Sequence, residues 1–348
     1  MTDSLQILKH IPEGFLNIKP RDIIKLISSP TIFHLKGKEE PPLFISLLLH
    51  GNEFSGLIIL QEILKKYEKD LPRNLIIFIG NPKACAQGVR HLEDQPDFNR
   101  IWNKEHSSEY PLTGSVLEYV KKNKIYAAVD IHNNTGENPL YACISKKDLD
   151  FIKLAQSFSE NIVYFTRPHS VLSQALSLIA PSLVIECGLP GYSQGITTGV
   201  QFIEKLLNSQ ESWKKEEIQI PYVYSTYATL LIDSDSEISF ESQLVLKKGQ
   251  LCLSDQIDQL NLKEVPVGTI LGKVNNFNPF KLIDNKGQDV FNQFFSIINN
   301  NWIVKASFIP SMFTKDTRIA KSDCLGYVMQ KISITDFLNK QKNEANPV

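Results

Sequence analysis

Between residues 42 and 208, short apolar runs alternate with longer stretches in which apolar residues recur at helical spacing. The apolar runs are only four to six residues long and contain many β-branched residues, which predicts buried strands. They cover residues 44–49, 75–79, 127–131, 140–145, 162–165 and 183–186. The stretches of helical period predict helices, at residues 55–67, 114–122, 147–159 and 197–207. This alternation is typical of an α/β domain with a largely buried sheet.

The pattern changes after residue 208, where the polar residues 209–219 predict a linker. Beyond them, short β-branched runs are separated by Gly, Asn and Asp, as in a small all-β domain. The runs lie at residues 222–232, 243–253, 267–274 and 302–308. Ser333 and Asp336 have capping-box spacing, with Asp in place of Glu, and predict a terminal helix over residues 333–341. We therefore divide the chain into an α/β domain, residues 1–212, and a smaller β-rich domain, residues 213–348.

Charge and cysteine content exclude several classes of protein. The chain has 37 Lys and Arg against 38 Asp and Glu, and no block of one sign marks a nucleic-acid or lipid-binding surface. The five cysteines contain no C-x-x-C pair, which argues against a disulfide framework and a thiolate zinc site. No run of about 18 apolar residues occurs. These features predict a cytoplasmic protein that binds neither nucleic acid nor membrane.

Histidine and glutamate indicate where the chemistry lies. All seven histidines fall within the first 169 residues, and H-x-x-E occurs three times, at His10, His50 and His106. Only His50 directly follows a predicted buried strand, and only its partner Glu53 directly precedes a long amphipathic helix. A His and a carboxylate at this spacing can reach one metal ion from a single turn. The other two pairs are expected to be solvated loop residues.

A third ligand is expected at another strand end on the same edge of the sheet. His132 directly follows the predicted strand over residues 127–131, and Asp130 can serve either as a ligand or as an acceptor that orients an imidazole. A lone histidine at such a place is more often a hydrogen-bonded core residue. The pairing of His132 with His50 and Glu53 at two strand ends favours the metal site.

Six short motifs in this order resemble the succinylglutamate desuccinylase/aspartoacylase family, a branch of the zinc carboxypeptidase superfamily. They are LHGNE (49–53), GNP (80–82), GVR (88–90), FNR (98–100), DIHNNTG (130–136) and IECG (185–188). The resemblance covers roughly residues 40 to 210. It implies a zinc-carboxypeptidase-like mixed sheet flanked by helices, followed by a smaller β-rich C-terminal domain.

The resemblance also implies a role for each matching residue. One Zn²⁺ per chain is expected at His50, Glu53 and His132. Arg90 would polarise the scissile carbonyl, Asn99 and Arg100 would bind a substrate carboxylate, and Glu186 would be the general base and acid. These roles are chemically reasonable, since a guanidinium stabilises an oxyanion and a carboxylate can take a proton from a metal-activated water. Ordinary surface salt bridges are the alternative for the two arginines.

Three departures from the family limit the choice of substrate. The segment between Arg90 and Asn99 is about two residues longer than in aspartoacylase-like sequences, so the loop that carries the carboxylate-binding pair is expected to differ. Leu176 stands where aspartoacylases have a second substrate-binding arginine, and residues 311–322 contain no counterpart of the family's C-terminal tyrosine. Asp94 and Asp97 are interpreted as loop residues, one of which holds Arg100. These departures weaken the case for a dicarboxylic substrate.

The sequence therefore favours a zinc-dependent hydrolase that cleaves the amide bond of a small N-acyl amino acid. The β-rich domain is expected to narrow the active-site cleft and to exclude long peptides. The alternatives are a zinc carboxypeptidase or amidase acting on short peptides, and a non-catalytic ligand-binding relative. The expected partner is a small molecule carrying a carboxylate, and association into a homo-oligomer stays open.

Overall fold

The predicted strands of the α/β part all form, within a mixed sheet of order β1-β2-β4-β3-β5-β8-β6-β7. Strands β4, β3, β5 and β8 run parallel, while β2 is antiparallel to β4 and β6 to β8. The bounds are β1 (Gln6–Leu8), β2 (Thr31–Leu35), β3 (Glu39–Leu47), β4 (Arg73–Ile79), β5 (Ala127–His132), β6 (Tyr141–Ile144), β7 (Ile162–Tyr164) and β8 (Ser182–Glu186). Strands β1 and β2 were not predicted.

The computed structural model describes residues 4–103, 109–209, 212–246, 250–275 and 278–344. The chain forms two compact units. Unit 1 comprises residues 1–133, 140–223 and 333–348, and unit 2 comprises residues 134–139 and 224–332. No helix in the described part of the chain is both long and apolar enough to cross a membrane.

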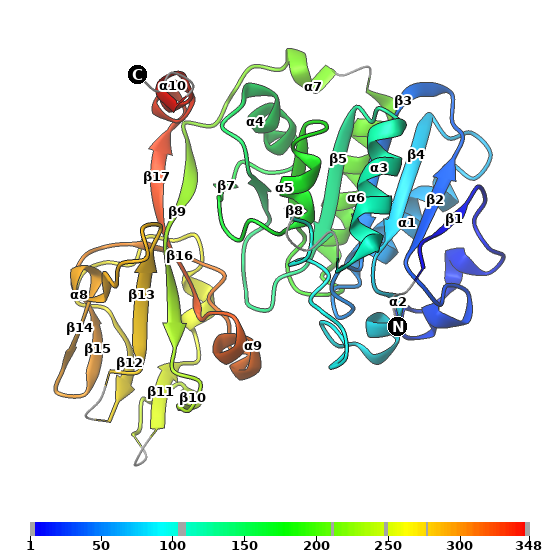
Figure 1. Cartoon of the computed structure of the whole chain (residues 1–348). Coiled ribbons are helices and arrows are strands. Elements are labelled where there is room, and N and C mark those ends of the chain that lie inside the picture. The colour runs from blue at the N-terminus through cyan, green and yellow to red at the C-terminus, as the bar shows by residue number, and fades with distance from the viewer. Residues whose placement is uncertain (1–3, 104–108, 210–211, 247–249, 276–277, 345–348) are drawn as a thin grey trace. The chain divides into compact units, whose positions relative to one another are not determined.

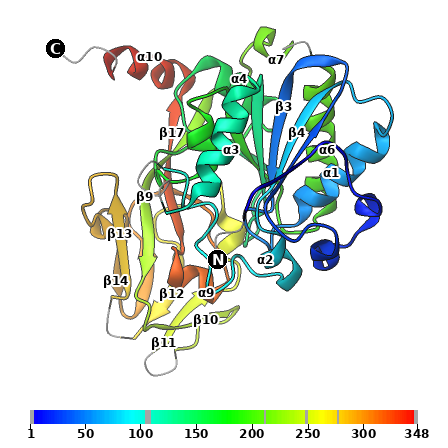
Figure 2. The same cartoon turned by 45° about the vertical axis from the view of Figure 1, so that its right-hand side comes forward.

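Helices cover both faces of the sheet of unit 1 (Figures 1 and 2). The helices are α1 (Ser55–Lys66), α2 (Pro82–Gln87), α3 (Pro111–Lys122), α4 (Leu149–Gln156), α5 (Leu172–Leu176), α6 (Ser193–Asn208), α7 (Ser212–Lys215) and α10 (Ile334–Glu344), with 3₁₀ turns η1 (Phe15–Asn17) and η2 (Pro20–Lys25). Helices α1 and α6 pack together on one face, where Gly199 of α6 approaches Ile59 of α1. The predicted terminal helix forms as α10, and the N–H of Asp336 donates to the Ser333 hydroxyl at 3.1 Å.

The opposite face of the sheet changes from apolar to polar along the central strands. Phe44 of β3 and Ala128 of β5 pack with α3 and α5 in one buried cluster. Side chains of a strand alternate between faces, so Ser46, Asp130 and His132 continue this same face toward the carboxyl ends of β3 and β5. The sheet therefore places polar residues directly beyond an apolar core, at the edge where the sequence predicts the site.

Unit 2 is rich in strands, as predicted. Strands β9 (Tyr222–Ile232), β17 (Gly326–Ser333) and β16 (Ile309–Ser311) pair in that order, and β13 (Phe280–Asp284) also pairs with β9. A second sheet has the order β10 (Glu237–Glu241), β11 (Gln250–Ser254), β12 (Ile270–Val274), β15 (Asn301–Val304), β14 (Phe295–Ile298). The remaining elements are η3 (Ile257–Leu260), α8 (Phe291–Phe294) and α9 (Thr317–Ser322).

The core of unit 2 is aromatic, and one predicted strand differs from expectation. The rings of Phe280 and Trp302 stack with their centroids 4.2 Å apart, and Phe295 contacts Trp302 edge-on at 5.2 Å. The strand predicted over residues 243–253 begins only at Gln250, and residues 247–249 lie outside the described residues. The three Phe and Trp rings supply the apolar area that a small β unit needs.

Unit 2 also holds the six residues that follow β5 and Asn133 in the chain. The buried amide of Asn261 accepts from the N–H of Phe313 at 2.8 Å and donates to the carbonyls of Phe313 at 2.9 Å and Glu137 at 3.1 Å. Asp258 accepts from the N–H of Glu137 at 3.2 Å. A Cβ on Gly136 would lie 2.2 Å from the carbonyl oxygen of Phe313, so only glycine allows this approach. The loop over residues 134–139 is thus bound through its backbone.

Candidate metal centre and its surroundings

A tight turn after β3 places His50 and Glu53 at the carboxyl end of the sheet. Leu48 has a positive φ of 57°, and the N–H of Glu53 donates to the carbonyl of His50 at 3.2 Å. Gly51 packs directly on α2, where a Cβ would lie 2.2 Å from the carbonyl carbon of Ala84. Its N–H donates to the carbonyl of Arg90 at 3.0 Å. The turn is therefore joined to the chain segment that carries Arg90.

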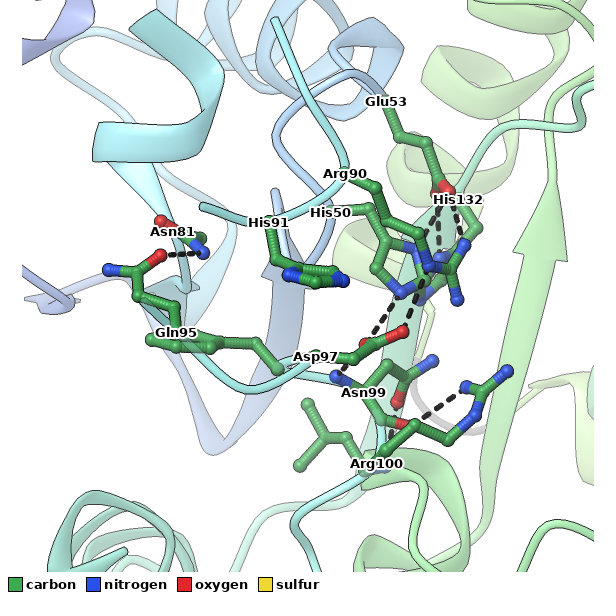
Figure 3. Close-up of polar contacts among 12 residues, drawn as sticks. His50, Glu53, Asn81, Arg90, His91, Gln95, Asp97, Asn99, Arg100 and His132 are labelled. Atoms are coloured by element: carbon green, nitrogen blue, oxygen red, sulfur yellow. Dashed lines mark hydrogen bonds and ion pairs between the residues drawn. The ribbon is translucent and has the colours of Figure 1, made fainter. Parts of the chain in front are cut away.

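His50, Glu53 and His132 are brought together as predicted, with one ligand atom of each within 4.8 Å of the others. Nδ1 of His50 lies 2.7 Å from Oε1 of Glu53, and Nδ1 of His132 lies 2.8 Å from Oε2. All three residues are only 4% exposed. Figure 3 shows both imidazoles turned toward the one carboxylate.

The donor set fits a divalent metal such as zinc. Two imidazole nitrogens and a carboxylate are the three protein ligands typical of a catalytic zinc site. The outer nitrogen of each ring faces another carboxylate, since Nε2 of His50 lies 3.0 Å from Asp97 and Nε2 of His132 lies 3.0 Å from Asp130. The hydrogen bond between His50 and Asp97 is the carboxylate–histidine arrangement that orients metal-binding imidazoles, whereas His132 and Asp130 are close without hydrogen-bond geometry.

Neighbouring charges shift the pKa values of Glu53 and His132 in opposite directions. Burial opposes ionisation of Glu53, yet the two imidazoles beside it hold its pKa well below the usual value. Burial also disfavours the charged form of His132, but Asp130 and Glu53 raise its pKa well above that of a free imidazole. The hydroxyl of Ser46 donates to Asp130 at 2.6 Å and fixes that carboxylate. A cation between these groups would be favoured by the same negative charges.

Asp97 contacts more of the site than any sequence argument predicted. Its carboxylate accepts from Nε of Arg90 at 2.9 Å and lies 3.0 Å from Nε2 of His50. It also accepts from the N–H of Asn99 at 2.7 Å. Burial raises the pKa of Asp97, but His50 and the two nearby arginines outweigh it and hold that pKa far below its usual value. The interpretation of Asp97 as a loop residue is therefore incomplete, because it holds His50 and Arg90.

The predicted carboxylate-binding pair follows directly after Asp97 and Phe98 (Figure 3). Asn99 is buried, and its side-chain oxygen accepts from the N–H of Leu172 at the start of α5, at 3.1 Å. Nη1 of Arg100 donates to the carbonyl of Asn99 at 3.0 Å. Nη1 of Arg90 lies 3.8 Å from Oε1 of Glu53 in the candidate metal group. The three donors thus come from one short stretch of chain beside the His–Glu–His group.

Glu186 ends β8 next to His132, a member of the candidate metal group. The two residues are register partners on the parallel strands β8 and β5, so their side chains leave the same face of the sheet. Glu186 is 7% exposed, and burial raises the pKa of its carboxyl to about 7. A carboxyl with a pKa near neutrality can both accept and return a proton, as a general base and acid must.

Residues 39–208 match the model of the succinylglutamate desuccinylase/aspartoacylase catalytic domain. Residues 39–208 belong to this family. The match confirms the resemblance drawn from the six motifs and covers nearly the same residues. No curated protein sequence matches the chain.

Solved structures of family members share the fold over most of their length. The structure described as succinylglutamate desuccinylase/aspartoacylase from Rhodobacter sphaeroides has a TM-score of 0.58 at 13% identity, covering 86% of this chain and 89% of that one. Succinylglutamate desuccinylase from Vibrio parahaemolyticus has a TM-score of 0.56 at 14% identity, covering 87% and 86%. Murine aminoacylase 3 has a TM-score of 0.52 at 12% identity, covering 85% and 97%. The mixed α/β fold with a smaller β-rich part is the family's own.

The remaining sequence features have structural roles or stay untested. Leu176 is fully buried in the cluster that α3 and α5 form with the sheet, so it is a core residue and no cation stands at this position. His10 and Glu13 are exposed, and His106 lies outside the described residues. Asn133 was missed: its backbone N–H donates to Oε2 of Glu53 at 3.1 Å. A backbone donor of this kind leaves no signal in a sequence.

Proposed function

We propose that the protein is a zinc-dependent hydrolase that cleaves the amide bond of a small N-acyl amino acid. The proposal rests above all on one observation, the buried His50–Glu53–His132 group with both Nδ1 atoms facing the same carboxylate. Membership of the succinylglutamate desuccinylase/aspartoacylase family supports the reaction class. A zinc ion held by these three residues would supply Lewis-acid activation of water and of the scissile carbonyl.

Each neighbouring side chain has a separate task in this proposal. Glu186 accepts a proton from the attacking water and returns it to the nitrogen of the leaving amine. Arg90 donates to the carbonyl oxygen as negative charge develops there, which is the largest single contribution in many acyl transfers. Asn99 and Arg100 bind a free carboxylate of the substrate, for which a guanidinium and an amide supply matched donors.

The substrate class follows from the donors near the site. The fully buried Leu176 leaves no cation at its position for a second carboxylate, which favours N-acyl derivatives of neutral amino acids over those of aspartate or glutamate. We further propose a cytoplasmic enzyme whose partner is this small molecule, with neither nucleic acid nor membrane as a partner. Narrowing of the cleft by the β-rich domain and assembly into a homo-oligomer stay predictions.

A substrate screen tests the proposal directly. The purified zinc-loaded protein should hydrolyse members of a panel of N-acetyl, N-succinyl and N-formyl amino acids. For each active compound, kcat/KM should fall strongly when the carboxylate is converted to a carboxamide. The reason is that Arg100 and Asn99 then no longer bind a negatively charged group. The variant His132→Ala should lose most of the zinc and the activity.

The outcomes separate the competing functions. Cleavage of short peptides would support a carboxypeptidase if it requires a free C-terminal carboxylate, and an amidase if it does not. Zinc retention by His132→Ala would refute the metal assignment. Ligand binding with no turnover on any compound of the panel would support a non-catalytic relative.

A further inference from the structure

A cavity of about 770 Å³ lies in unit 1, and no residue of the candidate metal group is among the described residues that line it. The lining comes from three parts of the chain: residues 4, 5 and 7, residues 93–96 with 98 and 101, and residues 110–112 with 115. A volume of this size is typical of a small-molecule binding site.

The inner wall of the cavity is apolar. Phe98 and Ile101 are 5% and 3% exposed and belong to the buried cluster that α3 forms with the sheet. Leu5, Tyr110 and Leu112 are partly buried and pack against the same cluster. A ligand of this cavity therefore needs an apolar group, which gains free energy by leaving water here.

The charged side chains of the lining are both acidic. Glu93 and Asp94 are neighbours in the chain, and both are exposed. No lysine, arginine or histidine lines the cavity in the part of the chain that the structure describes. The formal net charge of the whole protein is only −1, so the negative potential comes from these local carboxylates. They favour a cationic ligand and disfavour one that carries a carboxylate.

The cavity and the proposed carboxylate-binding pair share one short segment, residues 97–101. Phe98 and Ile101 line the cavity. Asn99 and Arg100 lie between them in the chain and are not among the lining residues. The segment is a tight turn, since the N–H of Arg100 donates to the carbonyl of Asp97 at 2.9 Å. A ligand packed on Phe98 and Ile101 therefore holds the turn that also carries the pair.

We propose that this cavity binds a small apolar amine without a carboxylate, and that the bound amine stabilises residues 97–101. The apolar part packs against Phe98 and Leu112, and the ammonium group lies beside Glu93 and Asp94. The amino acid released by the proposed reaction is a poor ligand, because its carboxylate meets the same two acids. Binding of the amine does not depend on the proposed hydrolase function.

A titration of the full-length protein with phenethylamine, followed by saturation-transfer NMR, tests the binding. We expect a dissociation constant of about 1 mM, as is usual for a ligand of this size. The neutral phenethyl alcohol and the acid phenylpropionate have similar shapes and should bind several-fold more weakly. The double variant Glu93→Gln/Asp94→Asn should bind the amine about three- to tenfold more weakly, since it loses two exposed charges.

Two further variants locate the binding. Ser115→Phe introduces a large side chain at an exposed position of the lining and should abolish binding of phenethylamine. The control Glu68→Gln/Asp70→Asn removes two exposed acids of unit 1 outside the lining and should bind phenethylamine like the wild type. The comparison of amine, alcohol and acid uses the wild type alone and does not depend on the folding of any variant.

Hydrogen exchange, followed by mass spectrometry, tests the second half of the proposal. At about ten times the dissociation constant, the amides of residues 97–102 should exchange up to about tenfold more slowly, because opening of the turn then requires release of the amine. An unchanged exchange rate would show that the amine does not stabilise this segment.

Three other results would overturn the binding site. Equal affinity for the amine, the alcohol and the acid would show that the two carboxylates select no charge. Wild-type affinity in Ser115→Phe would place the amine elsewhere on the protein. A dimer of the wild type that Ser115→Phe dissociates, measured by sedimentation, would mean that a second copy of the chain fills the cavity.

Discussion

Replacing Glu186 with glutamine should stabilise the metal-free protein and inactivate the zinc enzyme. Glutamine has nearly the same shape but cannot ionise or take a proton. Glu186 is 7% exposed, and its burial raises the pKa of the carboxyl from 4.5 to about 7. The folded protein therefore destabilises the ionised form that the proposed mechanism uses, and such conflicts between stability and activity are common at active sites.

The sign and size of the effect follow from proton linkage. Between pH 4.5 and about 7, the folded protein binds more protons at Glu186 than the unfolded chain does. The free energy of unfolding of the wild type consequently falls as pH rises through this interval and stays reduced above it. At about 1.4 kcal/mol per pH unit, the interval corresponds to roughly 3 kcal/mol. The free energy of unfolding of Glu186→Gln does not fall in this way, because an amide does not titrate.

Urea unfolding of the metal-free proteins, followed by circular dichroism, measures the effect. The wild type should lose about 2 kcal/mol more stability than Glu186→Gln between about pH 5 and about pH 8. The comparison across pH cancels any difference in packing between the two side chains. The exposed Glu264 provides a control, and Glu264→Gln should follow the wild type. In the zinc-loaded enzyme, Glu186→Gln should keep the metal while kcat falls by about 10² to 10⁴.

Three results would refute this reasoning. Parallel pH profiles for wild type and Glu186→Gln would mean that burial does not raise the pKa of this carboxyl. A kcat within a few-fold of wild type, on a substrate found in the screen, would remove Glu186 from proton transfer. Loss of zinc in Glu186→Gln would mean that the carboxylate is a ligand and not a base.

Two further predictions concern the buried amide of Asn261 in unit 2 and the turn of unit 1 that carries His50 and Glu53. Asn261→Ala should reduce the free energy of unfolding, measured with urea, by about 3 kcal/mol. Two backbone groups of Phe313 and one of Glu137 then lose buried hydrogen bonds worth about 1 kcal/mol each. The control variant Asn285→Ala removes one exposed hydrogen bond and should reduce the free energy of unfolding by less than about 1 kcal/mol. Gly51→Ala should weaken zinc binding, measured by competition with a chelating dye, by an order of magnitude or more, since a Cβ there would lie 2.2 Å from the backbone of α2 and displace the turn that carries His50 and Glu53. Unchanged zinc affinity would show that this turn can shift without cost.

The strands of unit 1 could be predicted because both faces of this sheet are covered. A doubly covered strand is apolar throughout, so β4 and β5 stand out as short runs between helical stretches. Strands β1 and β2 could not be found in this way. The run Thr31–Leu35 mixes polar with apolar residues. Strand β1 has only three residues, of which none is buried.

The grouping of His50, Glu53 and His132 could be predicted because strand ends carry positional information. His50 follows β3 and His132 ends β5, and these parallel strands are direct neighbours, so their carboxyl ends meet at one edge. The same reasoning reaches Glu186 on β8, the next strand along. Asn99 and Arg100 lie on a loop, where spacing says little about direction, and only the family resemblance pointed to them.

Asp97 was passed over, although the sequence contains a signal for it. Each metal-binding imidazole needs an acceptor for its second nitrogen. His132 has Asp130 two positions earlier, on the same face of the strand, whereas the residue two positions before His50 is Leu48. An acceptor for His50 must therefore come from elsewhere in the fold, and an acidic residue beside the Asn99–Arg100 pair was the natural place to look. The segment before Asn99 has three acidic residues, Glu93, Asp94 and Asp97, and the contacts with His50 and Arg90 in the structure identify Asp97.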